Sequence, residues 1–224
     1  MPRPLPPAVM ATTGGDPDAV RAHILASVRR VIDTRGLAAA STRAIAEEAG
    51  LSGGVLYNYF GNRVELVAAA VVDRAATLTD AVGELAERAG RDTVAQNLCW
   101  FVDRAVRVLD DLVPLLAAAF SDERLMLEIR AQIARLPATR PLVDPPGVVE
   151  RYLRAEQRLG RVRRDADCAS VAHLVAATCH DDAFHRHLAG TGTPRRSHEP
   201  EMVLLAESIT PDQDATETTG ENPS

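Results

Sequence analysis

Apolar residues recur along most of the chain with the three- and four-residue spacing of amphipathic helices. The first such segment begins after Asp16, which can cap a helix with Pro17 in its first turn, and it ends at Gly36. Its apolar positions are Val20, Ile24, Val28, Val31 and Ile32. Because no segment sustains an alternation of period two, the sequence predicts an all-α fold.

Further helices are expected wherever this spacing continues. They span residues 42–49, 53–60, 62–89, 94–113, 125–136, 148–159, 167–188 and 201–209. Pro114 and Pro137 should end the helices that precede them, because proline has no backbone N–H to donate. Residues 137–147 contain four prolines and are predicted to form a loop. The helix at 167–188 is apolar or small on nearly every side at its start, so we expect it to pack on its own domain and on a second subunit.

The two ends of the chain have a different composition. Residues 1–15 are rich in proline, threonine and glycine and hold too little apolar surface to pack, so we expect a disordered tail. Residues 211–224 contain four acidic residues and no basic one. They are expected to form a second, acidic disordered tail.

Composition narrows the class of protein. With 46% apolar and 25% charged residues, the chain is expected to be a soluble globular protein with an aliphatic core. The net charge of −6 does not by itself indicate a nucleic-acid partner, although every basic residue other than histidine is an arginine. With three cysteines, no signal-like segment and no apolar run near the roughly 20 residues of a membrane span, we expect a reduced, cytoplasmic protein that does not enter the membrane.

The segment Thr42–Phe60 has the residues that two short crossing helices require. Ala46 is small enough for a close crossing, and Gly50 suits the positive φ of a tight turn. Ser52 is placed to cap the second helix. The expected inward side chains are Ile45, Ala49, Leu51, Leu56 and Tyr59. The pattern fits a helix-turn-helix, and by itself it also fits an ordinary helical hairpin.

The flanking residues extend the pattern into a resemblance to the TetR family of transcriptional repressors. The residues that carry it are Ile45-Ala46, Ala49-Gly50-Leu51-Ser52, Gly54, Leu56-Tyr57, Tyr59-Phe60, Arg63 and Leu66. Gly53 departs from the family, which often has Lys or Arg there, and Arg63 replaces a Lys. The resemblance implies a homodimer with a helix-turn-helix DNA-binding domain at 16–62 and a helical ligand-binding and dimerisation domain at 63–210.

In this resemblance the second short helix enters the major groove of a palindromic operator. Asn58 would pair with an adenine edge, Val55 would touch a thymine methyl, and Arg43 would reach a guanine. The expected DNA-binding set is Thr42, Arg43, Ser52, Gly53, Gly54, Val55, Tyr57, Asn58, Tyr59 and Arg63. Of these, Thr42, Tyr57, Tyr59 and Arg63 are assigned to phosphates.

The resemblance also implies a small-molecule inducer, bound inside the C-terminal helices, that releases the repressor from DNA. The side chains chosen for size or for a polar group are Trp100, Phe101, Arg104, Phe120, Met126, Tyr152 and His173. Each of them could equally be an ordinary core residue. The ligand itself is not indicated.

Two other functions are compatible with parts of the sequence. The segment His180–His187 places Asp181 four residues before His185, so a metal-dependent hydrolase is one alternative. His173, His180 and His187 recur every seven residues on one helical stripe. An interaction module that keeps the helix-turn-helix shape without binding DNA is the other alternative. The regulator interpretation is favoured, with no catalytic residue, metal or cofactor expected.

Overall fold

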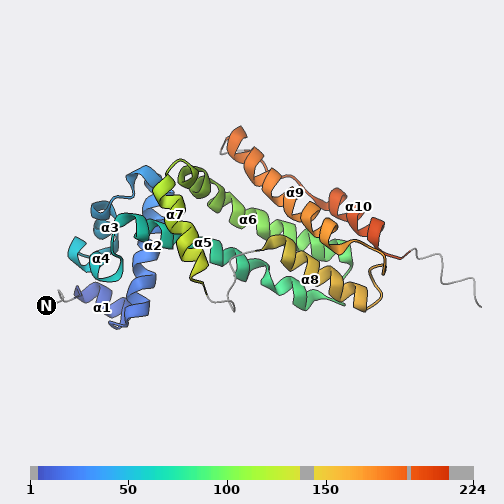
Figure 1. Ribbon diagram of the computed structural model, residues 1–224, viewed down its shortest axis with the longest axis horizontal. Coiled ribbons are helices and arrows are strands. Elements are labelled where there is room, and N and C mark those ends of the chain that lie inside the picture. Colours follow the sequence, from blue (N-terminus) through green and yellow to red (C-terminus); the bar gives the residue numbers. More distant parts are fainter. Residues whose placement is uncertain (1–4, 137–143, 191–192, 212–224) are drawn as a thin grey trace, which may run out of the picture. The chain divides into compact units, whose positions relative to one another are not determined.

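The computed structural model describes residues 5–136, 144–190 and 193–211. These residues form helices and connecting segments, without a strand in the described ranges (Figure 1). The expectation of an all-α fold is confirmed. The predicted acidic tail lies, after Pro211, outside the described residues, as does most of the predicted proline-rich loop.

The chain divides into two compact units that are not contiguous in sequence. The first comprises residues 1–77 and 111–143, and the second comprises residues 78–110 and 144–224. Two long helices, α5 (Arg63–Gly83) and α6 (Val94–Phe120), each contribute residues to both units. The expected domain boundary between residues 62 and 63 therefore falls inside the first unit.

The first unit contains the N-terminal helices, the first part of α5, the end of α6 and one later helix. Its other elements are α1 (Pro7–Thr13), α2 (Pro17–Arg35), a 3-10 turn η1 (Leu37–Ala39), α3 (Thr42–Ala49), α4 (Gly53–Tyr59) and α7 (Glu123–Ala134). Buried side chains of these helices form one apolar core. The core contains side chains of α2, α3, α4, α5 and α7, so α4 packs against the other helices of this unit.

The termini of α2 are those that its sequence predicts. The carboxylate of Asp16 accepts a hydrogen bond from the N–H of Ala19 at 3.2 Å, and Pro17 occupies the first turn. Gly36 follows the last helical residue with a φ of 79°, which favours glycine.

The expected tail at 1–15 is wrong for residues 7–13, which form α1. Val9 is buried in the apolar core, and the hydroxyl of Thr13 donates to the carbonyl of Val9. Gly14 ends this helix in the left-handed conformation. A helix of seven residues with one core side chain is too short to show a periodicity.

Proline affects two helix boundaries differently from expectation. The helix predicted to stop before Pro114 continues as α6 to Phe120. Leu112, Leu115 and Ala119 are buried, so packing on either side of the proline offsets the lost hydrogen bond. Pro145 starts the next helix, α8 (Pro145–Arg158), because a proline is tolerated in the first turn.

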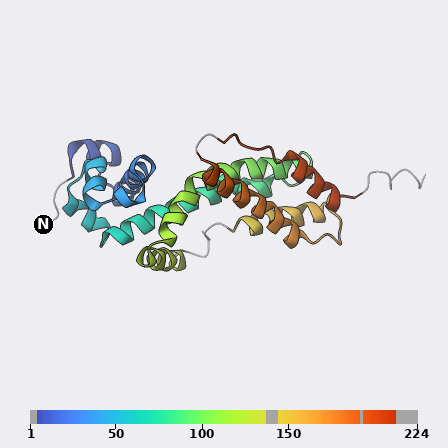
Figure 2. The same cartoon turned by 90° about the horizontal axis from the view of Figure 1, so that it is seen from above.

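The second unit is built from α8, α9 (Cys168–Ala189) and α10 (Glu199–Ile209), with the adjoining parts of α5 and α6. The helix predicted for 62–89 leaves the α conformation after Gly83 and continues as a 3-10 helix, η2 (Glu84–Arg88). Helices α8 and α9 lie side by side (Figure 2). The other predicted helices, 125–136, 148–159, 167–188 and 201–209, all appear with shifted ends.

The three cysteines are free thiols with different accessibility. Burial raises the pKa of the Cys179 thiol to about 12. Burial also raises the pKa of the half-buried Cys99, with help from the negative charges of Glu199 and Asp103. Both shifts reduce the reactive thiolate at neutral pH.

We therefore expect iodoacetamide at pH 8 to label Cys99 slowly and Cys179 only after denaturation. Peptide mass spectrometry over a time course measures both rates. If Cys179 in the folded protein were alkylated as fast as Cys99, the burial of its thiol would be contradicted.

Candidate nucleic-acid interface

The turn between α3 and α4 has the hydrogen bonds of a Schellman motif. The N–H of Leu51 donates to the carbonyl of Ala46 at 2.9 Å, and the N–H of Gly50 donates to the carbonyl of Glu47 at 3.2 Å. Gly50 adopts a φ of 64°, a left-handed conformation that favours glycine. The small buried side chain of Ala46 lies at the crossing. The turn predicted from these residues is confirmed.

The inner face of the helix pair is also as expected. Ile45, Ala49, Leu51 and Leu56 are buried, and Tyr59 is partly buried against the same core. Tyr59 is therefore more a packing residue than a free phosphate ligand. The two helices present their opposite faces to solvent.

Side chains of α2 hold the carboxyl ends of both helices. His23 Nε2 lies 2.9 Å from the carbonyl oxygen of Ala49, the last residue of α3. Arg21 Nη1 donates to the carbonyl oxygen of Tyr59 at 3.0 Å, and its guanidinium stacks 4.2 Å from the centre of the Phe60 ring. These contacts fix the position of α4 on the unit. Sequence reasoning missed both residues, because their partners are 26 and 38 positions away.

The solvent face carries the side chains that suit base and phosphate contacts. Arg43 is 89% exposed and forms an ion pair with Glu47, at 2.9 Å on its own helix. Tyr57 and Asn58 are exposed on α4. An exposed ion pair of this kind is weak and can exchange for a nucleic-acid partner.

Gly53 and Gly54 form a side-chain-free edge at the start of α4. Neither has a positive φ, and a Cβ atom added to either would meet no atom of the described residues within 4 Å. Neither backbone conformation nor packing inside the chain therefore requires glycine there. Glycine inside a helix costs about 0.5–1 kcal/mol relative to alanine, and the described fold does not account for two of them here.

Two of the expected DNA-binding residues, Val55 and Arg63, have structural roles. Val55 is only 2% exposed and belongs to the apolar core, so its predicted contact with a thymine methyl is wrong. Arg63 donates to the carbonyl oxygens of Ala40 at 2.7 Å and Leu37 at 3.2 Å, which secures the connection before α3.

Ser52 occupies the N-cap position of α4, yet its side chain does not form the predicted capping bond. Its Oγ is buried and has no hydrogen-bond partner among the described residues. Thr42 opens α3 and is partly buried.

The seven side chains expected to line a ligand pocket are divided between the two units and have different surroundings. Phe101 and Tyr152 are fully buried core residues, and Asn97 donates to the Tyr152 hydroxyl at 3.0 Å. Phe120 is 70% exposed, and His173 is exposed with its Nδ1 3.0 Å from the carbonyl of Ala169. These surroundings give the predicted pocket no support, and the ligand-binding set stays a prediction.

The remaining members of the set lie in separate places. Met126 packs on the core of the first unit. Trp100 and Arg104 line an open hollow of the second unit, where the guanidinium groups of Arg88 and Arg104 stack 4.8 Å and 4.9 Å from the Trp100 ring. Side-chain size and residue type, the criteria of the sequence prediction, therefore do not distinguish pocket residues from core or surface residues.

The histidine segment of α9 does not assemble a metal site in the described part of the chain. His185 lies 3.1 Å from Asp181, and both side chains are largely exposed. A ring nitrogen of His180 is hydrogen-bonded to the carbonyl oxygen of Ala176, and one of His187 to the carbonyl oxygen of Asp110. No group of three or more His, Cys, Asp or Glu side chains with metal-binding proximity occurs within the described ranges. The geometry gives the hydrolase alternative no support.

The α3–α4 geometry is that of a helix-turn-helix. Residues 24–70 match the sequence model of the tetR family of bacterial regulatory proteins. The match covers the helix-turn-helix together with parts of α2 and α5, the segment that carries the TetR resemblance.

Several solved structures that match this fold are described as transcriptional regulators. The fatty acid degradation regulator FadR of Bacillus halodurans has a TM-score of 0.60 and 15% identity, covering 83% of this chain and 93% of its own. FadR of Bacillus subtilis, solved with stearoyl-CoA, has a TM-score of 0.60 and 15% identity, with 84% and 98% covered. A TetR-family protein of Mesorhizobium loti has a TM-score of 0.64 and 16% identity, with 86% and 94% covered. No curated protein matches the chain.

Within the described ranges, no helix is both long and apolar enough to cross a bilayer.

Proposed function

We propose that this protein is a transcriptional repressor that binds a palindromic operator as a homodimer and is released by a small molecule. The observation that carries the proposal is the α3–α4 face, where Arg43, Tyr57 and Asn58 are exposed beside the side-chain-free edge of Gly53 and Gly54. A helix edge without side chains lets the backbone approach the groove closely. Asn58 would read an adenine and Arg43 a guanine.

Homodimerisation is supported by apolar side chains that the chain leaves exposed on α9. Leu174, Phe184 and Leu188 are all more than half exposed, although the opposite face of the same helix is buried. A second copy that covers this face would shield them from water. The dimer would then present two α4 helices to major grooves about 34 Å apart, as a palindromic operator requires.

Release by a small molecule is proposed from the two-unit construction. Helices α5 and α6 run from one unit into the other, so a ligand that favours one arrangement of these helices also changes the position of α4. The B. subtilis FadR structure was solved with stearoyl-CoA, and a ligand in a protein of similar fold supports this part of the proposal. The identity of the ligand here does not follow from that resemblance.

Selection of binding sites from random duplex DNA tests the proposal. We expect the native protein to enrich an inverted repeat, and Arg43→Ala with Tyr57→Ala to lose the enrichment. Arg124→Ala, an exposed arginine on α7, serves as the matched control and should enrich the same repeat.

Salt separates a regulator from a module that only interacts with other proteins. Affinity for the selected site should fall steeply between 50 and 200 mM salt, because arginine contacts to phosphate release counterions. A folded dimer that enriches no sequence at low salt would contradict the proposal and favour the interaction module.

A further inference from the structure

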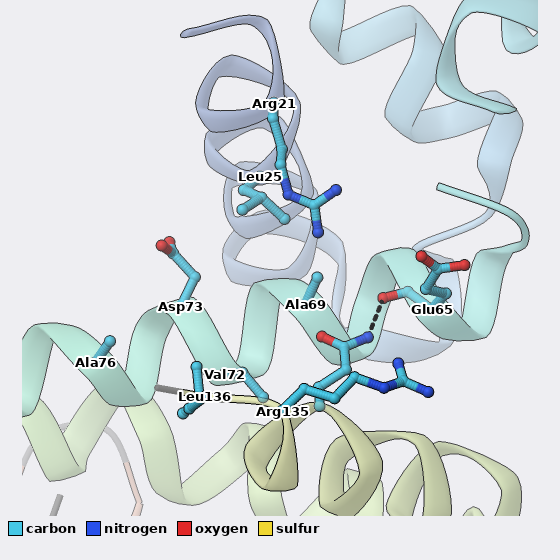
Figure 3. A pocket seen from close by; sticks show the side chains of 10 residues that line it. Arg21, Leu25, Glu65, Ala69, Val72, Asp73, Ala76, Arg135 and Leu136 are labelled. Atoms are coloured by element: carbon cyan, nitrogen blue, oxygen red, sulfur yellow. Dashed lines mark hydrogen bonds between the residues drawn. The ribbon is translucent and has the colours of Figure 1, made fainter. Parts of the chain in front are cut away.

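A cavity of about 310 Å³ opens between α2, α5 and α7 in the first unit (Figure 3). Leu25, Ala69, Val72 and Leu136 supply apolar lining. The volume is at the lower end of the range for small-molecule sites, about 300–1,000 Å³. None of the residues that were expected to bind a ligand lines this cavity.

The two carboxylates at the rim already have cationic or N–H partners. Asp73 accepts from Arg29 at 2.6 Å, and Glu65 accepts from the backbone N–H of Gly61 at 2.8 Å. These contacts reduce the ability of either carboxylate to bind a cationic ligand. The lining also includes two arginines, Arg21 and Arg135. Because the carboxylates are already paired, the rim favours an anionic ligand although its acidic and basic residues are equal in number.

The two arginines of the rim have fewer or weaker contacts than these carboxylates. Arg135 is 72% exposed, and its ion pair with Glu128 is 3.7 Å long. Figure 3 shows the head group of Arg21 extending from α2 into the space above α5. Its bond to Tyr59 uses only one of the five N–H groups of a guanidinium. Gln132, whose Nε2 donates to the carbonyl of Glu65, adds a further polar group.

We propose that this cavity binds a small organic anion, a carboxylate on a short apolar body, and that the anion acts on α4 through Arg21. The guanidinium of Arg21 would donate N–H groups to the carboxylate, because a planar guanidinium can form two parallel hydrogen bonds with its two oxygens. The apolar body would lie against Leu25, Val72 and Leu136. Binding of the anion does not depend on the proposed function, whereas its effect on DNA binding rests on that function.

The coupling follows from the double contact of Arg21. Its guanidinium holds the carbonyl at the end of α4 and lines the cavity at the same time. An anion that draws this group toward the cavity weakens the bond to Tyr59, so α4 is held less firmly. By reciprocity, operator DNA must weaken binding of the anion by the same factor.

Titration calorimetry of the full-length protein with hexanoate and phenylacetate tests the site. Hexan-1-ol is the neutral control. We expect a carboxylate to bind, the alcohol to bind at least about 10-fold more weakly, and Arg135→Gln to weaken the carboxylate about 10-fold, since one charged contact is worth about 1.4 kcal/mol or more. Arg130→Gln, on the same helix, should change nothing.

A variant that fills the cavity gives a second measurement. Ala76→Phe should abolish carboxylate binding while its circular dichroism and melting temperature stay close to those of the native protein. If neither carboxylate binds, or if binding is unchanged in both Arg135→Gln and Ala76→Phe, the site is refuted.

Operator affinity measured with and without the carboxylate tests the coupling. A saturating carboxylate should weaken operator binding by about 5- to 150-fold, the usual range for coupled sites. Arg21→Ala should weaken operator binding and make it insensitive to the anion. Carboxylate binding with unchanged operator affinity would refute the coupling alone, and a protein that selects no operator would refute the proposed function alone.

Discussion

Replacing Phe184 and Leu188 by glutamate is expected to convert the protein to a monomer and to lower operator affinity at least about 100-fold. The two side chains lie one turn apart on α9 and are 55% and 71% exposed, so the substitutions remove little core packing. In a dimer they would place charges inside an apolar interface, which is strongly unfavourable. A monomer then loses the avidity of two linked half-sites, about 100-fold or more.

Light scattering during size-exclusion chromatography measures the mass, and fluorescence anisotropy measures operator affinity. Leu127→Glu is the matched control, because Leu127 is a similarly exposed apolar residue on α7. The control should remain dimeric and bind the operator normally. Dimers formed by the doubly substituted protein would contradict the proposed α9 interface, and a monomer with native affinity would contradict the need for two half-sites.

The helix-turn-helix could be predicted because its determinants are local. Gly50 and Ala46 act within one turn of the chain, and the Schellman bonds they permit involve residues at most five positions apart. The same reasoning failed for Val55. On a helix of seven residues the choice of buried face depends on neighbouring helices, and α4 turns Val55 as well as Leu56 into the core.

Contacts between distant segments account for the other differences. Arg21 and His23 look like ordinary polar positions of an amphipathic helix, and only folding brings them to the ends of α4 and α3. The cavity near Arg21 is lined from α2, α5 and α7, partly by small residues such as Ala69 that carry no chemical signal. By contrast, choosing ligand residues by size selected Tyr152, which fills the core of the second unit.

Alanine at both Gly53 and Gly54 is expected to raise the stability of the fold and to weaken operator binding at least about 10-fold. In the part of the chain that the structure describes, the added Cβ atoms meet no atom within 4 Å, and they require no change of backbone conformation. Each substitution should therefore raise the free energy of unfolding by about 0.5–1 kcal/mol, as alanine restricts the unfolded chain. In the groove, the same atoms would separate α4 from the DNA and lengthen several contacts at once, each worth about 1–3 kcal/mol.

Opposite signs of the two effects distinguish this explanation from general damage to the domain. Urea unfolding measures stability, and anisotropy at fixed salt measures affinity. Gly83→Ala provides the control, since Gly83 has a helical φ of −60° and equally open surroundings at the end of α5. It should stabilise the protein without affecting DNA. Native operator affinity in the Gly53→Ala, Gly54→Ala protein would show that close approach of this edge is not how α4 meets the groove, leaving Arg43 and Asn58 to carry recognition.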